Sequence, residues 1–160
     1  IVVFIVGMIG LFAFGRKSAG PVSLFAAYNC CIIPIGFSVF AVTNGVEGRA
    51  LMEAAMLTSA ITLTMCLGGT LFPAFFLGIG RFLFFSLLTF VVAEFIGIFA
   101  FGYLPRWVDL IAVGLFSLYI AFDWAVAMTG SWTPRAVLRT AIDLYLDIIN
   151  IFLSLVRGRK

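Results

Sequence analysis

Short segments with charged residues, Gly and Pro divide the sequence into six long apolar stretches. A transmembrane helix needs about 20 predominantly apolar residues, and these stretches reach or approach that length. They are residues 1–15, 22–43, 51–72, 82–103, 108–128 and 135–156. Because only helices and closed barrels satisfy their backbone inside a bilayer, the pattern predicts an all-α, polytopic transmembrane helical bundle that forms one domain over residues 1–160.

The composition agrees with a membrane location and excludes several chemistries. Only 11% of the residues are charged and 64% are apolar, whereas a soluble domain has about 25% charged residues to cover its surface. The chain has no His, which excludes Ser-His-Asp hydrolases, HExxH proteases and most zinc sites. We therefore expect no enzymatic activity and no cofactor. The net charge of +3 comes partly from the basic C-terminal residues, which suit an anionic lipid surface, and nucleic-acid binding has no support.

The first and last stretches leave two points open: how many helices cross the membrane and how the bundle is oriented in it. The first stretch has 15 residues and begins with Ile, so we expect that the chain is truncated at its N-terminus and lacks part of at least one helix. If all six stretches cross the membrane, the basic residues divide five and five between the two sides, and the positive-inside rule gives no orientation. If the last stretch instead enters and returns, the division becomes eight and two.

Four acidic residues lie inside the apolar stretches: Glu94, Asp123, Asp143 and Asp147. A charged side chain at bilayer depth costs about 2.5 to 3.5 kcal/mol on insertion scales, so each of these residues is a candidate functional group. Glu94 has no basic residue within one helical turn. A functional role and a neutral, hydrogen-bonded Glu both remain open for it.

The last stretch carries its polar residues on one side. At about 100° per residue, a helix places Arg139, Asp143, Asp147 and Asn150 within one sector, which cannot face lipid. Arg139 lies one turn from Asp143 and is expected to neutralise it as a local ion pair. Asp147 has no such partner along the helix. This polar stripe therefore predicts a helix face that is turned toward the bundle interior or a wet cavity.

Asp123, on the preceding stretch, also has no basic residue one turn away. Two unpaired carboxylates on consecutive helices become tolerable if they share one proton or one cation. A shared proton makes such a pair sensitive to pH near neutrality without any His. When both are ionised, their hard oxygen atoms suit calcium better than soft metals. The residues thus predict a proton-sensitive cation site at Asp123 and Asp147, with calcium bound only transiently.

The same segments resemble a known family. Residues 141–153, AIDLYLDIINIFL, resemble the C-terminal signature of the Bax inhibitor (transmembrane Bax inhibitor motif) family, and residues 117–123, SLYIAFD, resemble its preceding helix. Weaker likeness covers residues 24–40 and 78–85. The resemblance implies a seven-helix bundle, of which six helices are present, in which Asp123 and Asp147 form a pH-sensitive pair that gates a calcium leak. It also implies a bacterial inner membrane or the endoplasmic reticulum and Golgi, and we expect the bacterial inner membrane.

Two function classes remain in competition. The first is a pH-sensitive calcium leak channel whose partners are calcium ions, protons and the lipid bilayer. The alternative is a membrane-embedded regulator that binds another membrane protein, such as a protease or a cell-death factor, without ion transport, with the aspartates purely structural. An intramembrane aspartyl protease is disfavoured, because the residues before Asp147 are Leu-Tyr-Leu rather than the Gly-x-Gly of those enzymes.

Overall fold

The structure is a computed structural model that describes residues 21–102 and 105–158. These residues form helices and no strand, which confirms the all-α prediction. The predicted helix over residues 1–15 lies outside the described residues. The chain separates into two compact units, residues 1–44 and 45–160, and each is described by itself. That the whole chain is one domain stays a prediction.

In the first unit, α2 (Pro21–Thr43) is a single helix of 23 residues, close to the predicted range of 22–43. Pro34 lies inside it without ending it. The hydroxyl group of Ser38 donates to the carbonyl oxygen of Pro34 at 3.2 Å, and that of Thr43 donates to the carbonyl of Val39 at 2.8 Å. Such hydroxyl-to-carbonyl bonds satisfy these two polar side chains within the helix itself.

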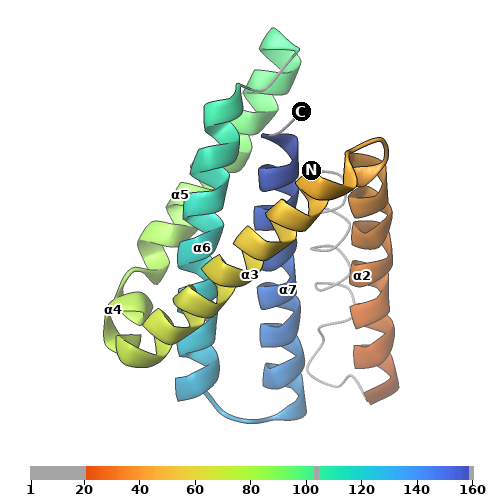
Figure 1. The fold of residues 1–160 in the computed structure, drawn as a ribbon. Helices are drawn as coiled ribbons and strands as arrows, with labels where there is room; N and C mark the ends of the chain where they lie inside the picture. The colour runs from red at the N-terminus through yellow and green to blue at the C-terminus, as the bar shows by residue number, and fades with distance from the viewer. Residues whose placement is uncertain (1–20, 103–104, 159–160) are drawn as a thin grey trace. The chain divides into compact units, whose positions relative to one another are not determined.

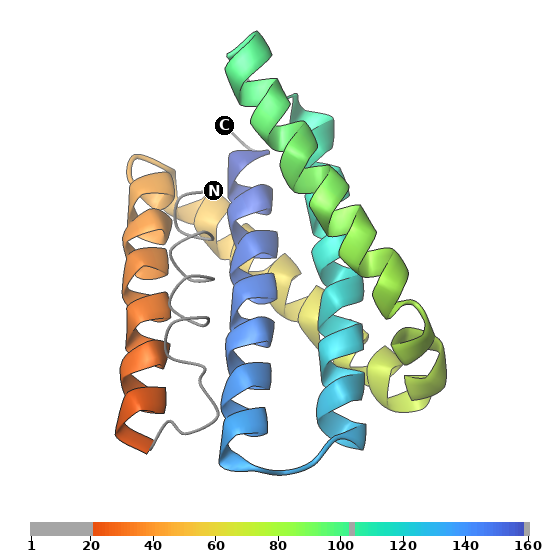
Figure 2. The ribbon, with the colours of Figure 1, turned by 180° about the vertical axis from the view of Figure 1, so that it is seen from behind.

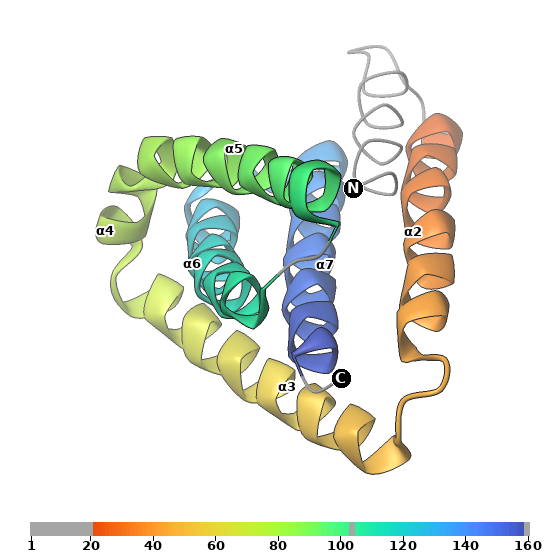
Figure 3. The same ribbon diagram turned by 90° about the horizontal axis from the view of Figure 1, so that it is seen from above.

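The second unit is built around one central helix. Its elements are α3 (Gly48–Leu71), α4 (Pro73–Gly78), α5 (Gly80–Ile96), η1 (Gly97–Phe101), α6 (Arg106–Thr129) and α7 (Pro134–Arg157). Figure 3 shows α6 surrounded by α3, α4, α5 and α7. The core accordingly consists mostly of α6 side chains. Its buried residues are Leu83, Phe90, Val108, Ala112, Leu115, Phe116, Ile120 and Ile151.

The helices α6 and α7 form the most extensive pair, and they run antiparallel along each other (Figure 2). Each has 24 residues, which corresponds to about 36 Å of helix. The start of α7 is well defined, because Thr133 accepts a hydrogen bond from the Ala136 N–H at 3.3 Å and Pro134 occupies the first turn. The last apolar stretch is thus one continuous helix and does not enter and return within its length.

Pro73 ends α3 as predicted, but it also begins a short helix that the sequence analysis did not predict. Proline lacks an N–H group, which the first turn of a helix does not need, so the residue that stops one helix can start the next. As a result, α4 occupies residues between the predicted helices 51–72 and 82–103, and α5 begins at Gly80 rather than at residue 82. Figure 1 shows α4 at the corner where the chain turns from α3 into α5.

The helix predicted over residues 82–103 changes its winding near its end. The α-helix stops at Ile96 and continues as one π-helical turn, η1, which ends at Gly102. Gly102 has φ +72°, a left-handed conformation that glycine adopts without strain and that is common directly after a helix. The prediction placed this end too late, because an uninterrupted apolar run does not show where the winding changes.

Three of the described helices are long and apolar enough to cross a membrane: Gly48–Leu71, Gly80–Ala100 and Arg106–Thr129. Large apolar side chains on α3 and α5 are exposed, including Leu63, Leu67 and Phe85. A water-soluble protein rarely exposes so many of them side by side, whereas lipid tails cover such a surface at no cost. The fold is that of a multi-pass membrane protein.

Candidate functional site

The polar stripe predicted on the last helix lies on α7. At its start, Arg139 and Asp143 form the expected local ion pair, with 3.7 Å between Nε and Oδ2. The Arg139 side chain is 81% exposed, so water or lipid headgroups screen the pair and it contributes little to stability. Arg139 does, however, place a positive charge beside Asp143.

Asp123 and Asp147, which have no basic residue one turn away, lie on the adjacent helices α6 and α7. Their side chains are close enough for the charge of Asp123 to act on Asp147. Asp147 is 6% exposed, and its Oδ2 atom is buried with no hydrogen-bond donor among the described residues. Two carboxyl groups can bond to each other only if one of them carries a proton. The arrangement therefore suits a shared proton, and complete ionisation would place a second negative charge near the buried carboxylate of Asp147.

A cavity of about 660 Å³ opens beside this pair, between the end of α6, the start of α7 and the loop that joins them. Asp123 and Asp143 contribute carboxyl groups to its wall, and Arg139 contributes a guanidinium group. Asp147 does not line the cavity. The acids that face the cavity are thus Asp123 and Asp143.

Three contacts fix the turn of α6 that carries Asp123. The indole N–H of Trp124 donates to Oγ1 of Thr70 on α3 at 2.8 Å. Gly69 lies so close to α6 that a Cβ atom there would be 2.5 Å from the Ala121 carbonyl oxygen. A Cβ atom on Gly80 would be 2.7 Å from the Phe122 ring. The bulk of Trp124 is evident from sequence, but its hydrogen bond to Thr70 is not.

A second charged cluster lies at the other end of α7. Nη2 of Arg157 is 3.0 Å from Oδ1 of Asp109 on α6 and 3.8 Å from Oε1 of Glu94 on α5. Glu94 thus has a basic partner, although none is near it in the sequence. Arg157 is ten residues after Asp147, which places the two clusters about 15 Å apart along the helix. The residues Asn150 and Ser154 continue the polar stripe between them.

The described residues contain no group of three or more His, Cys, Asp or Glu side chains that could hold a metal ion. Calcium takes about six to eight oxygen ligands, so Asp123 and Asp147 alone are too few for a tightly held ion. The pair has the chemistry for passing contact with a hydrated cation or for holding a proton.

Residues 1–158 match the model of the family described as Inhibitor of apoptosis-promoting Bax1. No individual curated protein matches the chain.

Proposed function

Because this chain belongs to the Bax inhibitor family, we propose that it is a pH-sensitive calcium leak channel of a membrane, gated by Asp123 and Asp147. The observation that supports the proposal best is that buried Asp147 lies near Asp123, which lines an acid-lined cavity. The proposed ligands are protons and calcium ions, and the surroundings are the lipid bilayer. The proposed location is a bacterial inner membrane, and the proposed role involves no enzymatic step and no cofactor.

The gate would work by electrostatics. With one proton between them, Asp123 and Asp147 attract each other and hold α6 against α7. When the proton leaves, two negative charges remain in a buried place where water screens them poorly, so they repel each other. Separation of the carboxyl groups, or a cation between them, relieves this repulsion. Flux should therefore be low at acidic pH and rise as the pH increases.

The cavity would supply the ions. Asp143 and Asp123 attract cations into it, while Arg139 partly offsets this attraction. Beyond the pair, the polar stripe on α7 continues with Asn150 and Ser154. Oxygen atoms along this line can replace part of the water around a moving calcium ion, which prefers oxygen ligands.

The test is calcium flux into liposomes that contain the purified protein, measured over a series of pH values. We expect Asp123→Asn and Asp147→Asn to abolish the pH dependence, because an amide cannot release the proton. Glu53→Gln is the control, since this residue pairs with Arg49 on the exposed surface of α3. If both Asn variants keep the flux and pH profile of the wild type, the gating mechanism is wrong. If the wild type carries no flux and co-purifies with a stoichiometric membrane protein, the regulator alternative replaces the channel.

A further inference from the structure

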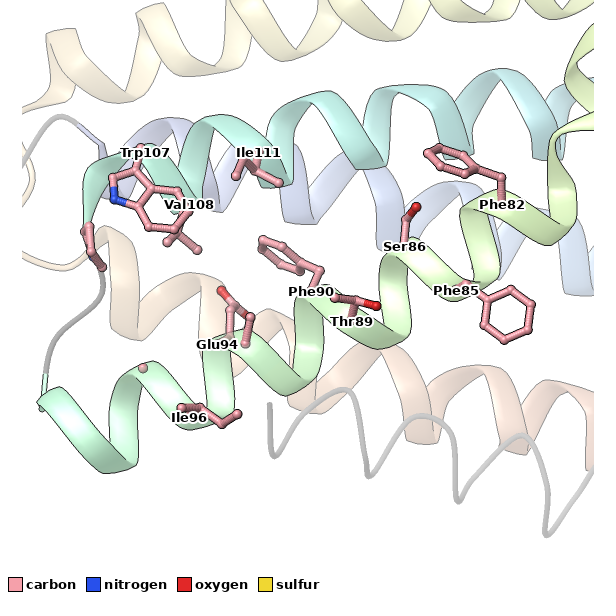
Figure 4. A pocket seen from close by; sticks show the side chains of 13 residues that line it. Phe82, Phe85, Ser86, Thr89, Phe90, Glu94, Ile96, Trp107, Val108 and Ile111 are labelled. Atoms are coloured by element: carbon pink, nitrogen blue, oxygen red, sulfur yellow. The ribbon is translucent and has the colours of Figure 1, made fainter.

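A second cavity, of about 700 Å³, lies between α5 and the first half of α6, away from the aspartate pair. Figure 4 shows Phe90 and Glu94 pointing from α5 toward α6, with Trp107 and Val108 across from them. Most of its wall is apolar, and the polar side chains in it are Ser86, Thr89 and Glu94. A cavity of this size with apolar walls and few polar groups is typical of a small-molecule site.

The charge in this cavity is not balanced. Arg157 is shared between two carboxylates, and Asp109 lies closer to it, at 3.0 Å, than Glu94 does, at 3.8 Å. Among the described residues, the cluster of one guanidinium group and two carboxylates carries one surplus negative charge when all three groups are ionised. Glu94 lines the cavity and Asp109 does not, so the surplus charge is presented to whatever occupies the cavity. An uncompensated carboxylate in such apolar surroundings is costly, and a positive charge beside it removes that cost.

The length of the cavity also points to a class of ligand. Phe82 lies at one end of its α5 wall and Glu94 lies near the other end, twelve residues away, which corresponds to about 18 Å of helix. That distance matches an extended alkyl chain. Trp107 lies at the end near Glu94 and follows Arg106 at the start of α6. Trp and Arg at a helix end are typical of the membrane interface, so Glu94 is near the level at which lipid headgroups lie.

We propose that the cavity between α5 and α6 binds a single-chain amphiphile with a cationic ammonium head. The head lies against the Glu94 carboxylate, and the chain lies along α5 toward Phe82. The Trp107 ring offers the ammonium group an additional cation–π contact. An anionic amphiphile is repelled by the surplus charge, and a neutral one gains nothing from it, so the site selects by head charge. This proposal does not depend on calcium transport.

The experiment is native mass spectrometry of the full chain released from neutral maltoside micelles, with dodecyltrimethylammonium as the probe and dodecanol as its neutral counterpart. We expect the wild type to bind the ammonium compound at least about tenfold more tightly than dodecanol. A contact between opposite charges in surroundings that partly exclude water provides a difference of this size. Glu94→Gln should remove this preference, while Glu53→Gln should retain it.

Two further variants test the charge balance rather than the presence of Glu94. Arg157→Gln leaves both carboxylates uncompensated and should tighten ammonium binding. Asp109→Asn leaves Glu94 as the only partner of Arg157 and should weaken ammonium binding, although Asp109 does not line the cavity. Equal binding of both probes by the wild type would overturn the proposal and make the cavity an ordinary lipid-facing groove. Unchanged ammonium affinity in both Glu94→Gln and Arg157→Gln would overturn it as well.

Discussion

Arg157, near the end of α7, pairs with Asp109 in the first turn of α6, with 3.0 Å between Nη2 and Oδ1. The same guanidinium group reaches Glu94 on α5. One side chain therefore joins three helices. Because α6 and α7 run antiparallel, Arg157 holds the helix pair together at one end, while Asp147 lies near the middle of α7.

The first prediction concerns this pair. Arg157→Gln should lower the free energy of unfolding by about 1 to 2 kcal/mol, because it leaves Asp109 and Glu94 without a cation. The figure is below that of a fully buried pair, since the Arg157 side chain is 40% exposed and partly screened. The measurement is thermal unfolding in neutral detergent. Arg49→Gln, at an exposed ion pair on α3, should change stability by less than about 0.5 kcal/mol. Equal losses in both variants would contradict the structural role of Arg157.

The placement of Asp123 and Asp147 on adjacent helices could be predicted from the sequence, whereas the pairing of Arg157 with Glu94 could not. Residues 108–128 and 135–156 are long apolar runs joined by a short loop, and such helices are antiparallel neighbours. That was enough to expect Asp123 and Asp147 on adjacent helices. Arg157 and Glu94 could not be paired in this way, because their contact depends on how α5 leans against α6 and α7. No spacing in the sequence gives that arrangement. The sequence also could not show that Pro73 both ends α3 and begins α4.

The second prediction concerns the close approach of α3 to α6. A Cβ atom on Gly69 would lie 2.5 Å from the backbone carbonyl oxygen of Ala121, which cannot move without its helix. Gly69→Ala should therefore destabilise the fold by about 1 to 3 kcal/mol, the usual cost of overpacking. Gly114→Ala is the matched control. A Cβ atom there has nothing within 4 Å, so alanine should stabilise α6 by up to about 1 kcal/mol. Thermal unfolding of both variants measures the difference, and a destabilisation of equal size in the two would be the contrary result.

The third prediction concerns the hydrogen bond between Trp124 and Thr70. Thr70→Val removes the acceptor but leaves the indole N–H, so it should cost about 1 kcal/mol. Trp124→Phe removes the donor, and the double variant should lose less than the sum of the two single losses. Thermal unfolding of the four proteins of this double-mutant cycle gives the coupling energy. If the two single losses of stability add up to the loss in the double variant, the hydrogen bond does not stabilise the packing of α3 against α6.

The fourth prediction rests on the proposed calcium transport and concerns Arg139. This residue offsets the negative charge of Asp143 in the cavity beside the aspartate pair, at 3.7 Å. Arg139→Gln should increase calcium flux at low calcium concentration, because the cavity becomes more negative and attracts cations more strongly. Because the charge of Arg139 also acts on Asp123, the two proteins are compared at a pH high enough for the proposed gate to be open in both.

Ionic strength separates this electrostatic effect from a change in the pore itself. The Debye length falls from about 30 Å at 0.01 M salt to about 10 Å at 0.1 M, so the gain in flux should shrink as salt is added. Liposome flux at the two salt concentrations is the measurement, and Arg49→Gln, which removes an exposed arginine on α3, is the control. A gain that persists at high salt, or one that Arg49→Gln reproduces, would mean that Arg139 does not act through the charge of the cavity.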